Sequence, residues 1–363
     1  MLHISAMELS SKPRLSTMCL FVMTALLLSA TAAHGRCKKA LFVFGDSLFD
    51  PGNNQYLNST SEQGTATTWP YGQTYFKRAT GRLSDGRIVP DFVAQFARLP
   101  ILAPYLQPGT KNLTLGTNFA SAGAGVLSET HPGTISLREQ LSYFKDVDKK
   151  LKDQMGAAAT KKLLMDAVYL FSMGGNDYFS FYMSHSKAAA TQPQKRAIVA
   201  SVTGNLSQIL QEVYDIGGRK IGFQNVGALG CLPGMKAMNG ITTAGCISGL
   251  CELARLHNLA LAKVLKNLEA KNSGFKYSIF NYYDAIYQRV TYPSKHGFKD
   301  GDDACCGPMN CGKNGTKVCS NPNEYVWFDG GHTTQRANYQ LAQLIWAGPR
   351  NVTGPYNFRQ FFM

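Results

Sequence analysis

Short apolar runs alternate along this chain with longer segments in which apolar residues recur at helical spacing. The apolar runs predict strands at residues 40–44, 113–120, 167–173, 220–226 and 275–283. The helical spacing predicts helices at residues 89–99, 137–155, 194–216, 247–271 and 334–346. Strands that alternate with helices favour a mostly parallel sheet covered on both faces. We therefore expect an α/β fold, a flavodoxin-like three-layer αβα sandwich of about five strands.

Two long polar segments interrupt this alternation, at residues 55–82 and 291–325. Both are predicted to be loops, the second rich in cysteine and glycine. Neither has the composition of a linker between domains, and no internal repeat or low-complexity tract divides the chain. We expect residues 37–363 to form a single domain whose two long loops wall a binding pocket.

The first 36 residues have the order of a secretory signal peptide. Lys12 and Arg14 precede an apolar run at residues 18–30, and small residues follow it. Cleavage is expected between Ala32 and Cys37. The run is too short for a comfortable membrane span, although a retained anchor is the alternative. The mature protein is expected to be secreted, extracellular in an apoplast or cell wall, with the vacuole as a second destination.

Cysteines and glycosylation sequons agree with a secretory route. Cys19 would leave with the signal, and an even number of cysteines remains, which favours disulfides without fixing their pairing: Cys37, Cys231, Cys246, Cys251, Cys305, Cys306, Cys311 and Cys319. A zinc site in the last four is the alternative, but the spacing of a zinc ribbon is absent. The Asn-x-Ser/Thr sequons are predicted glycan sites: Asn58, Asn112, Asn205, Asn314 and Asn351.

Charge excludes some functions and leaves one open. The formal net charge is +14, and the basic residues are scattered rather than clustered. Without a recognisable motif, nucleic-acid binding is not expected. A soluble basic surface is the simpler interpretation, and weak adhesion to anionic cell-wall polymers such as pectin is the alternative. Charged residues are only 17% of the chain, so long disordered regions are not expected.

Two segments carry candidate chemistry. The first predicted strand ends in Gly45-Asp46-Ser47, which places a hydroxyl at the carboxyl end of a sheet, where α/β folds bind ligands. Near the other end of the chain, Asp329 and His332 lie three residues apart in a glycine-containing turn. Such a carboxylate can orient the imidazole, which can then accept a proton from a serine. The alternative for Ser47 is a turn or helix cap.

These segments, in this order, resemble the plant GDSL-type lipase/esterase family of the SGNH hydrolase superfamily. The matching blocks are Gly45-Asp46-Ser47-Leu48 with Asp50 and Gly52-Asn53-Asn54, then residues 118–123, then Gly174-Gly175-Asn176-Asp177, and finally Asp329 with His332. The resemblance implies a catalytic triad and an oxyanion hole, with the triad formed by Ser47, Asp329 and His332. The oxyanion hole would use the backbone N–H groups of Ser47 and Gly123 and the side-chain amide of Asn176.

One position departs from the family pattern, because Thr333 stands where many members have proline. The proline does no chemistry, so we expect catalysis to survive, with the geometry of the turn the part most affected. The G-x-S-x-G motif of ordinary α/β-hydrolases is absent. The leading hypothesis is a serine esterase or lipase that acts on carboxylic esters without a metal or an organic cofactor. An acyltransferase with the same acyl-enzyme and a non-catalytic binding or modifier protein are the alternatives.

Overall fold

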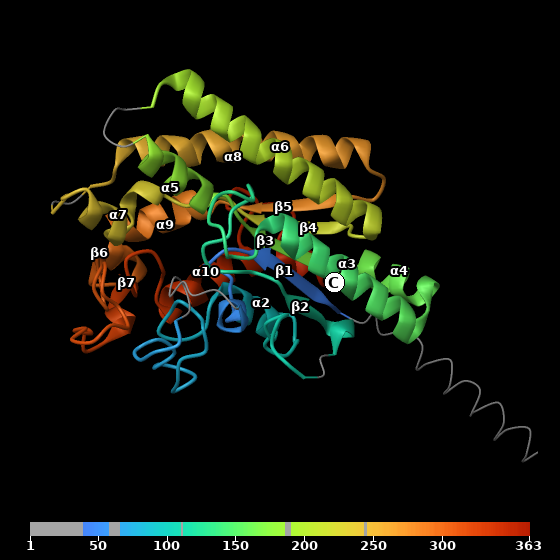
Figure 1. Ribbon diagram of the computed structural model, residues 1–363, viewed down its shortest axis with the longest axis horizontal. Coiled ribbons are helices and arrows are strands. Elements are labelled where there is room, and N and C mark those ends of the chain that lie inside the picture. The colour runs from blue at the N-terminus through green and yellow to red at the C-terminus, as the bar shows by residue number, and fades with distance from the viewer. Residues whose placement is uncertain (1–38, 58–65, 110–111, 186–189, 243–244) are drawn as a thin grey trace, which may run out of the picture. The chain divides into compact units, whose positions relative to one another are not determined.

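The computed structural model describes residues 39–57, 66–109, 112–185, 190–242 and 245–363. Its central sheet has six strands in the order β2-β1-β3-β4-β5-β8 (Figure 1). The strands are β1 (Leu41–Gly45), β2 (Gly116–Asn118), β3 (Val168–Ser172), β4 (Lys220–Gln224), β5 (Lys276–Phe280) and β8 (Thr353–Pro355). The first five are parallel, in the order of a flavodoxin-like fold, and all five lie within segments predicted to be strands. The predicted fold class is confirmed.

Strand β1 lies inside the sheet, and every one of its residues is buried. Phe44 stacks on Phe171 of β3 with ring centroids 4.6 Å apart, and Phe171 stacks in turn on Phe223 of β4. Large apolar side chains on adjacent parallel strands thus form the centre of the core. Because β1 pairs with both β2 and β3, the residue that follows it emerges at the point where the strand order reverses.

Helices cover both faces of the sheet (Figure 1). In chain order they are α2 (Val89–Phe96), α3 (Leu137–Met155), α4 (Ala157–Asp166), α5 (Gly175–Ser184), α6 (Gln192–Ile216), α7 (Pro233–Met238), α8 (Ser248–Lys271), α9 (Tyr282–Thr291), α10 (Gln335–Ala347) and α11 (Phe358–Phe361). Helices α3, α6 and α8 pack on one face, and α2 packs with α10 on the other. Local sequence sets the ends, as at α3, where Ser136 and Glu139 form a capping box.

A second, two-stranded sheet was not predicted. It pairs β6 (Asp300–Ala304) with β7 (Tyr325–Trp327) inside and just beyond the segment expected to be a loop. Disulfides Cys305–Cys319 and Cys306–Cys311 fold the segment between these strands, so the four cysteines weighed as a zinc site are paired with one another. This small sheet matters because β7 leads directly into the turn that carries Asp329 and His332.

Some predictions concern residues that the structure does not describe. The proposed signal peptide, Cys37 and the sequon at Asn58 lie outside the described residues. Among the described residues, the third disulfide is Cys231–Cys246, and Cys251 is a buried free thiol. In the described part of the chain, no helix combines the length and the apolarity needed to cross a membrane.

Candidate active site

Ser47 follows β1 in a turn that the core fixes from behind. The buried side chain of Gln140, from α3, accepts a hydrogen bond from the Gly45 backbone N–H (2.9 Å) and donates one to the Gly45 carbonyl (2.8 Å). Asp46 accepts from the N–H of Leu48 at 3.1 Å and is itself buried. The strand end is therefore held on both sides, and the next side chain, Ser47, is left half-buried at the wall of a cavity.

The motif residues after Ser47 hold the second block of the site. The Asp50 carboxylate accepts from the N–H groups of Gly52 and Asn53 and, through its other oxygen, from the N–H of Ala122 at 2.8 Å. Asn54 donates to the Ala122 carbonyl at 2.8 Å. These bonds position Gly123, whose φ of +83° favours glycine. The Asp50 and Asn54 side chains thus set the geometry of a backbone N–H rather than perform chemistry.

Asn176 lies in the first turn of α5, directly after β3. Its amide nitrogen donates to the Ala124 carbonyl at 2.9 Å, which orients the side chain and leaves a second amide hydrogen for another acceptor. The neighbouring buried Asp177 accepts from the N–H groups of Val126 and Leu127, both at 3.0 Å. The second and third blocks are therefore joined by direct hydrogen bonds.

The turn after β7 pairs Asp329 with His332. Oδ1 of Asp329 lies 2.7 Å from Nδ1 of His332 and also accepts from the N–H groups of Gly331 and His332, both at 2.9 Å. Oδ2 accepts from the hydroxyl of Tyr71 at 2.9 Å. Because Asp329 can only accept, Nδ1 of the imidazole carries the hydrogen, and Nε2 is left to act as a base.

This pairing shifts the pKa of both partners. Burial by itself would raise the pKa of Asp329, but the charge of His332 and the hydrogen bonds outweigh burial and lower it below 3.8. Burial would lower the pKa of His332, yet the charge and the hydrogen bond of Asp329 raise it above 6.5. For Asp46, burial dominates and raises the pKa to about 7, although the nearby charge of His332 opposes the shift. The ion pair therefore makes His332 a stronger base than a free imidazole.

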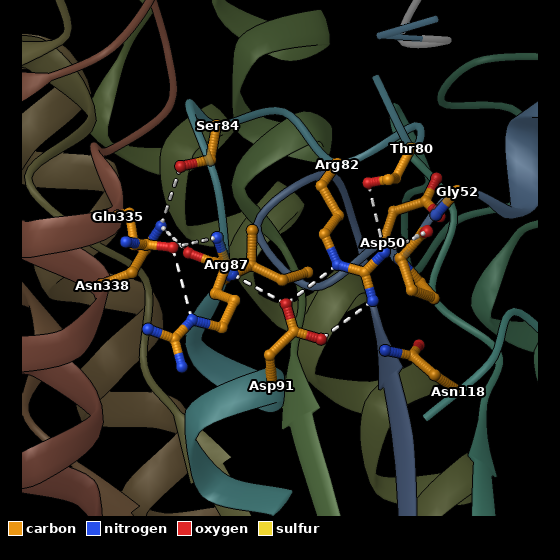
Figure 2. Close-up of polar contacts among 12 residues, drawn as sticks. Asp50, Gly52, Thr80, Arg82, Ser84, Arg87, Asp91, Asn118, Gln335 and Asn338 are labelled. Atoms are coloured by element: carbon orange, nitrogen blue, oxygen red, sulfur yellow. Dashed lines mark hydrogen bonds and ion pairs between the residues drawn. The ribbon is translucent and has the colours of Figure 1, made fainter. Parts of the chain in front are cut away.

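The turn that carries Asp329 and His332 will be called the acid–base turn. A network of polar side chains connects it to residues 66–88, which we call the brace loop. Ser84 donates to the Thr333 carbonyl at 3.0 Å, and Asn338 of α10 donates to the carbonyls of Thr333 and Arg87. Figure 2 shows Ser84, Arg87, Gln335 and Asn338 on one side of this network. The Thr333 hydroxyl donates to Asn338 at 2.6 Å, a bond that proline at this position could not make.

The brace loop is itself fixed by a buried ion pair at its end. Arg82 binds the two oxygens of Asp91 through Nε and Nη2, both at 2.9 Å, with side-chain exposures of 6% and 3% (Figure 2). Nη1 of the same guanidinium donates to the Pro51 carbonyl at 3.0 Å. One arginine therefore connects the brace loop, α2 and the segment that follows Ser47.

One cavity of about 290 Å³, which we call the inner cavity, brings the separate blocks together. Its lining includes four of the predicted site residues, which come from segments far apart in the sequence: Ser47, Gly123, Asn176 and His332. Asp329 lies behind His332 and does not line this cavity. The apolar part of the wall is formed mainly by residues 225–232 and by α9, and not by the two long loops from which a pocket wall was expected.

Tyr71 was not among the site residues predicted from the sequence. Its ring packs edge-on against Phe328, and its hydroxyl completes the set of donors around Asp329. Tyr71 and Asp329 are 258 positions apart, so no local pattern connects them. Only the close approach of the brace loop to the turn after β7 reveals the contact.

Comparison with known proteins agrees with the motifs. Residues 41–345 match the family described as GDSL-like Lipase/Acylhydrolase, so the chain belongs to that family and the resemblance read from its motifs is confirmed. "GDSL esterase/lipase 4" of Arabidopsis thaliana is 43% identical over 89% of this chain and 90% of its own length. "GDSL lipase" of Tanacetum cinerariifolium is 43% identical over 99% of this chain and 96% of its own length.

The similar proteins include one whose name denies activity. "Inactive GDSL esterase/lipase-like protein 25" of Arabidopsis thaliana is 38% identical over 90% of this chain and 75% of its own length. Among solved structures, a lipase from a goat rumen metagenome covers 84% of this chain at 12% identity with a TM-score of 0.39, too loose a likeness to bear on function. Whether this chain is active therefore depends on the residues of its own site.

Proposed function

We propose that this protein is a secreted serine esterase or lipase that hydrolyses carboxylic esters through an acyl-enzyme on Ser47. Family membership supports the class of reaction. The observation that carries the mechanism is that Ser47, Gly123, Asn176 and His332 line one cavity while Asp329 holds Nδ1 of His332 at 2.7 Å. The inactive relative gives no reason to doubt this chain, because every residue that the mechanism needs is present.

In the proposed mechanism, Nε2 of His332 removes the proton from the Ser47 hydroxyl as Oγ attacks the ester carbonyl carbon. Asp329 keeps the imidazole in the right tautomer and stabilises the imidazolium that forms. His332 then gives the proton to the leaving alcohol, and the acyl group stays on Ser47. Water attacks the acyl-enzyme by the same path and releases the acid.

The oxyanion formed in each step needs donors that are already in place. The backbone N–H groups of Ser47 and Gly123 and the second amide hydrogen of Asn176 are the candidates, as the resemblance implies. Asn176 also lies at the positive end of the α5 dipole. Loss of one such donor costs about 3 kcal/mol of transition-state stabilisation, or on the order of 10²-fold in rate.

Secretion is part of the proposal. The disulfides found among the described residues are typical of an oxidising compartment, and the sequon asparagines Asn112, Asn314 and Asn351 are exposed. Asn205 is half-buried within α6, which makes it the least accessible of the described sequons. Mass spectrometry of protein purified from plant culture medium would identify the mature N-terminus and the glycans. A first residue upstream of position 30 would contradict cleavage of the signal.

The test of the catalytic assignment uses Ser47→Ala and a short p-nitrophenyl ester. We expect turnover to fall to background while the unfolding free energy stays within about 1 kcal/mol of wild type, because the substitution removes one hydroxyl from a half-buried side chain. A fluorophosphonate probe should label the wild type and not the variant. Ser184→Ala, on the exposed end of α5, is the control and should keep full turnover. Undiminished hydrolysis by Ser47→Ala would rule out the mechanism.

A further inference from the structure

A second cavity, which we call the outer cavity, is also lined by His332 but not by Ser47. Its volume is about 340 Å³, and the residues that give it its character are Tyr71, Met235, Met238, Pro308, Met309 and Asp329. The inner and outer cavities share a common wall made of Leu83, Phe179, Leu232, Gly331 and His332. The two cavities are therefore adjacent at His332.

Close backbone contacts build the floor of the outer cavity. The Gly234 N–H, at the start of α7, donates to the Gly330 carbonyl at 2.7 Å. A Cβ on Gly330 would lie 2.0 Å from the Pro308 carbonyl oxygen, so only glycine allows the acid–base turn to approach this segment. The cavity is thus a built feature in which α7, the disulfide-bonded segment and the acid–base turn meet.

The two cavities differ in what borders them. The residues proposed to bind the carbonyl group, Ser47, Gly123 and Asn176, line only the inner cavity. Inner-wall side chains such as Met173, Ile286 and Trp327 are each 1% exposed. At the rim of the outer cavity, Met238 and Met309 are 49% and 51% exposed. The outer cavity is therefore more open to solvent than the inner one.

The sequence of steps in ester hydrolysis indicates which part of the substrate each cavity would bind. An ester whose carbonyl carbon lies at Ser47, with its oxygen toward Gly123 and Asn176, must place its bridging oxygen at His332, which protonates it. The alkyl group on that oxygen continues past His332. The alcohol also leaves first, so its site must open to solvent while the acyl group stays bound.

We propose that the outer cavity is the alcohol subsite of this enzyme and that it binds apolar primary alcohols, both as leaving groups and as acyl acceptors. The proposal rests on the proposed function. Met side chains are apolar and adaptable, which suits alkyl groups of varied shape. An alcohol bound there attacks the acyl-enzyme carbonyl in place of water. Its hydroxyl proton passes to Nε2 of His332 and then to Oγ of Ser47, as the bond from that Oγ to the acyl carbon breaks and a new ester leaves.

The experiment measures how one acyl-enzyme partitions between water and added alcohols. p-Nitrophenyl butyrate forms the same butyryl-enzyme in every reaction, and the products with methanol, 1-butanol or 1-hexanol are butyric acid and the alkyl butyrate. Burial of a methylene is worth up to about fourfold in affinity, so we expect about two- to fourfold more alkyl ester per added methylene. From methanol to 1-hexanol the gain is then roughly thirtyfold or more.

Variants inside and outside the outer cavity show which residues set the preference for the alcohol. In Met238→Ser/Met309→Ser, the preference for 1-hexanol over methanol should fall about tenfold, because the apolar rim is lost. Met183→Ser changes a methionine that is also 51% exposed but lines neither cavity, and it should leave the preference unchanged. Ile286→Val, on the inner wall, should change the preference for acyl-chain length and not that for the alcohol.

Two results would overturn the assignment of the outer cavity as the alcohol subsite while leaving the proposed function intact. One is normal hydrolysis and Ser47 labelling with no dependence on alcohol length. The other is a rim double variant that alters acyl-length preference instead, which would place the acyl chain in the outer cavity. Failure of the proposed function looks different, since wild type would then neither turn over the ester nor react with the fluorophosphonate.

Discussion

The substitution Asp329→Asn tests the acid–base pair because the structure predicts that it removes charge without changing the tautomer of His332. Oδ1 of Asp329 accepts all three N–H bonds of the turn, while Oδ2 faces the Tyr71 hydroxyl. An asparagine can keep its oxygen toward the same three donors. Its amide nitrogen then donates to the Tyr71 oxygen, which can accept as well as donate.

The expected loss of activity follows from the missing charge alone. Two unit charges about 4 Å apart, at an effective dielectric constant of about 20, interact by about 4 kcal/mol. If that stabilisation of the imidazolium is lost in the transition state, kcat falls about 10³-fold. A serine protease in which the same substitution forces the wrong tautomer loses about 10⁴-fold, so a smaller loss is expected here.

The pH dependence gives a second readout with a defined sign. Asp329 raises the pKa of His332 above 6.5, and the base must be neutral to act, so wild-type activity should fall as the pH drops through a midpoint above 6.5. Without the charge, this limb of the profile should move to lower pH.

The assay is kcat for a short p-nitrophenyl ester between pH 5 and 9, with denaturant unfolding as the control for folding. Asp329→Ala is the matched comparison, because it leaves the N–H groups of Gly331 and His332 without an acceptor and should also destabilise the turn. A kcat for Asp329→Asn within tenfold of wild type, or a limb that moves to higher pH, would refute the reasoning.

Two further substitutions probe the supports of the site, and a third probes His257, a buried residue of α8. Tyr71→Phe leaves Oδ2 of Asp329 buried without its donor, which costs about 1–3 kcal/mol, so kcat should fall about tenfold at unchanged KM; an unchanged kcat would exclude a positioning role. Asp91→Asn breaks the buried pair with Arg82 and should cost about 3–5 kcal/mol of unfolding free energy in urea; a loss below about 1 kcal/mol would contradict this. Burial lowers the pKa of His257 from 6.5 to about 3, so its neutral form stabilises the fold above pH 6.5 and this contribution, up to about 5 kcal/mol, is lost toward pH 3. His257→Gln should lose less stability between pH 8 and pH 4 than wild type does; equal losses would be inconsistent with it.

Strands were predictable where burial leaves a continuous run of apolar residues. Strands β6 and β8 were not predicted, because their sequences contain no such run. Strands β1 and β3 are buried along their whole length, and each appears in the sequence as an apolar run. Strand β8 is only Thr-Gly-Pro, too short to leave a pattern. Strand β6 reads Asp-Gly-Asp-Asp-Ala, and its place is fixed by contacts such as the bond from the Trp327 indole to the Gly301 carbonyl. Such tertiary contacts leave no periodicity in the sequence.

The residues of the site also divide into those that could be predicted from the sequence and those that could not. Ser47, Asn176 and the Asp329–His332 pair lie in short motifs because each must leave a strand or begin a helix at a fixed offset. The walls follow no such rule. The long loops expected to line the pocket contribute Tyr71 and Met309 to the outer cavity, whereas the inner wall comes mainly from residues 225–232 and α9. Side-chain walls depend on which segments meet in space, and one sequence does not encode that locally.

Thr333 shows how a local rule has been replaced by tertiary contacts. Proline at this position would stiffen the turn by fixing its own φ angle. Here the Thr333 hydroxyl donates to Asn338, and its carbonyl accepts from Ser84 of the brace loop. The rigidity of the acid–base turn therefore depends on a segment that also supplies Tyr71 to Asp329 and Leu83 to the wall between the two cavities. Since one loop serves all three purposes, a change that shifts it should alter the rate and the alcohol preference together, whereas a change at the exposed methionine rim should alter the preference alone.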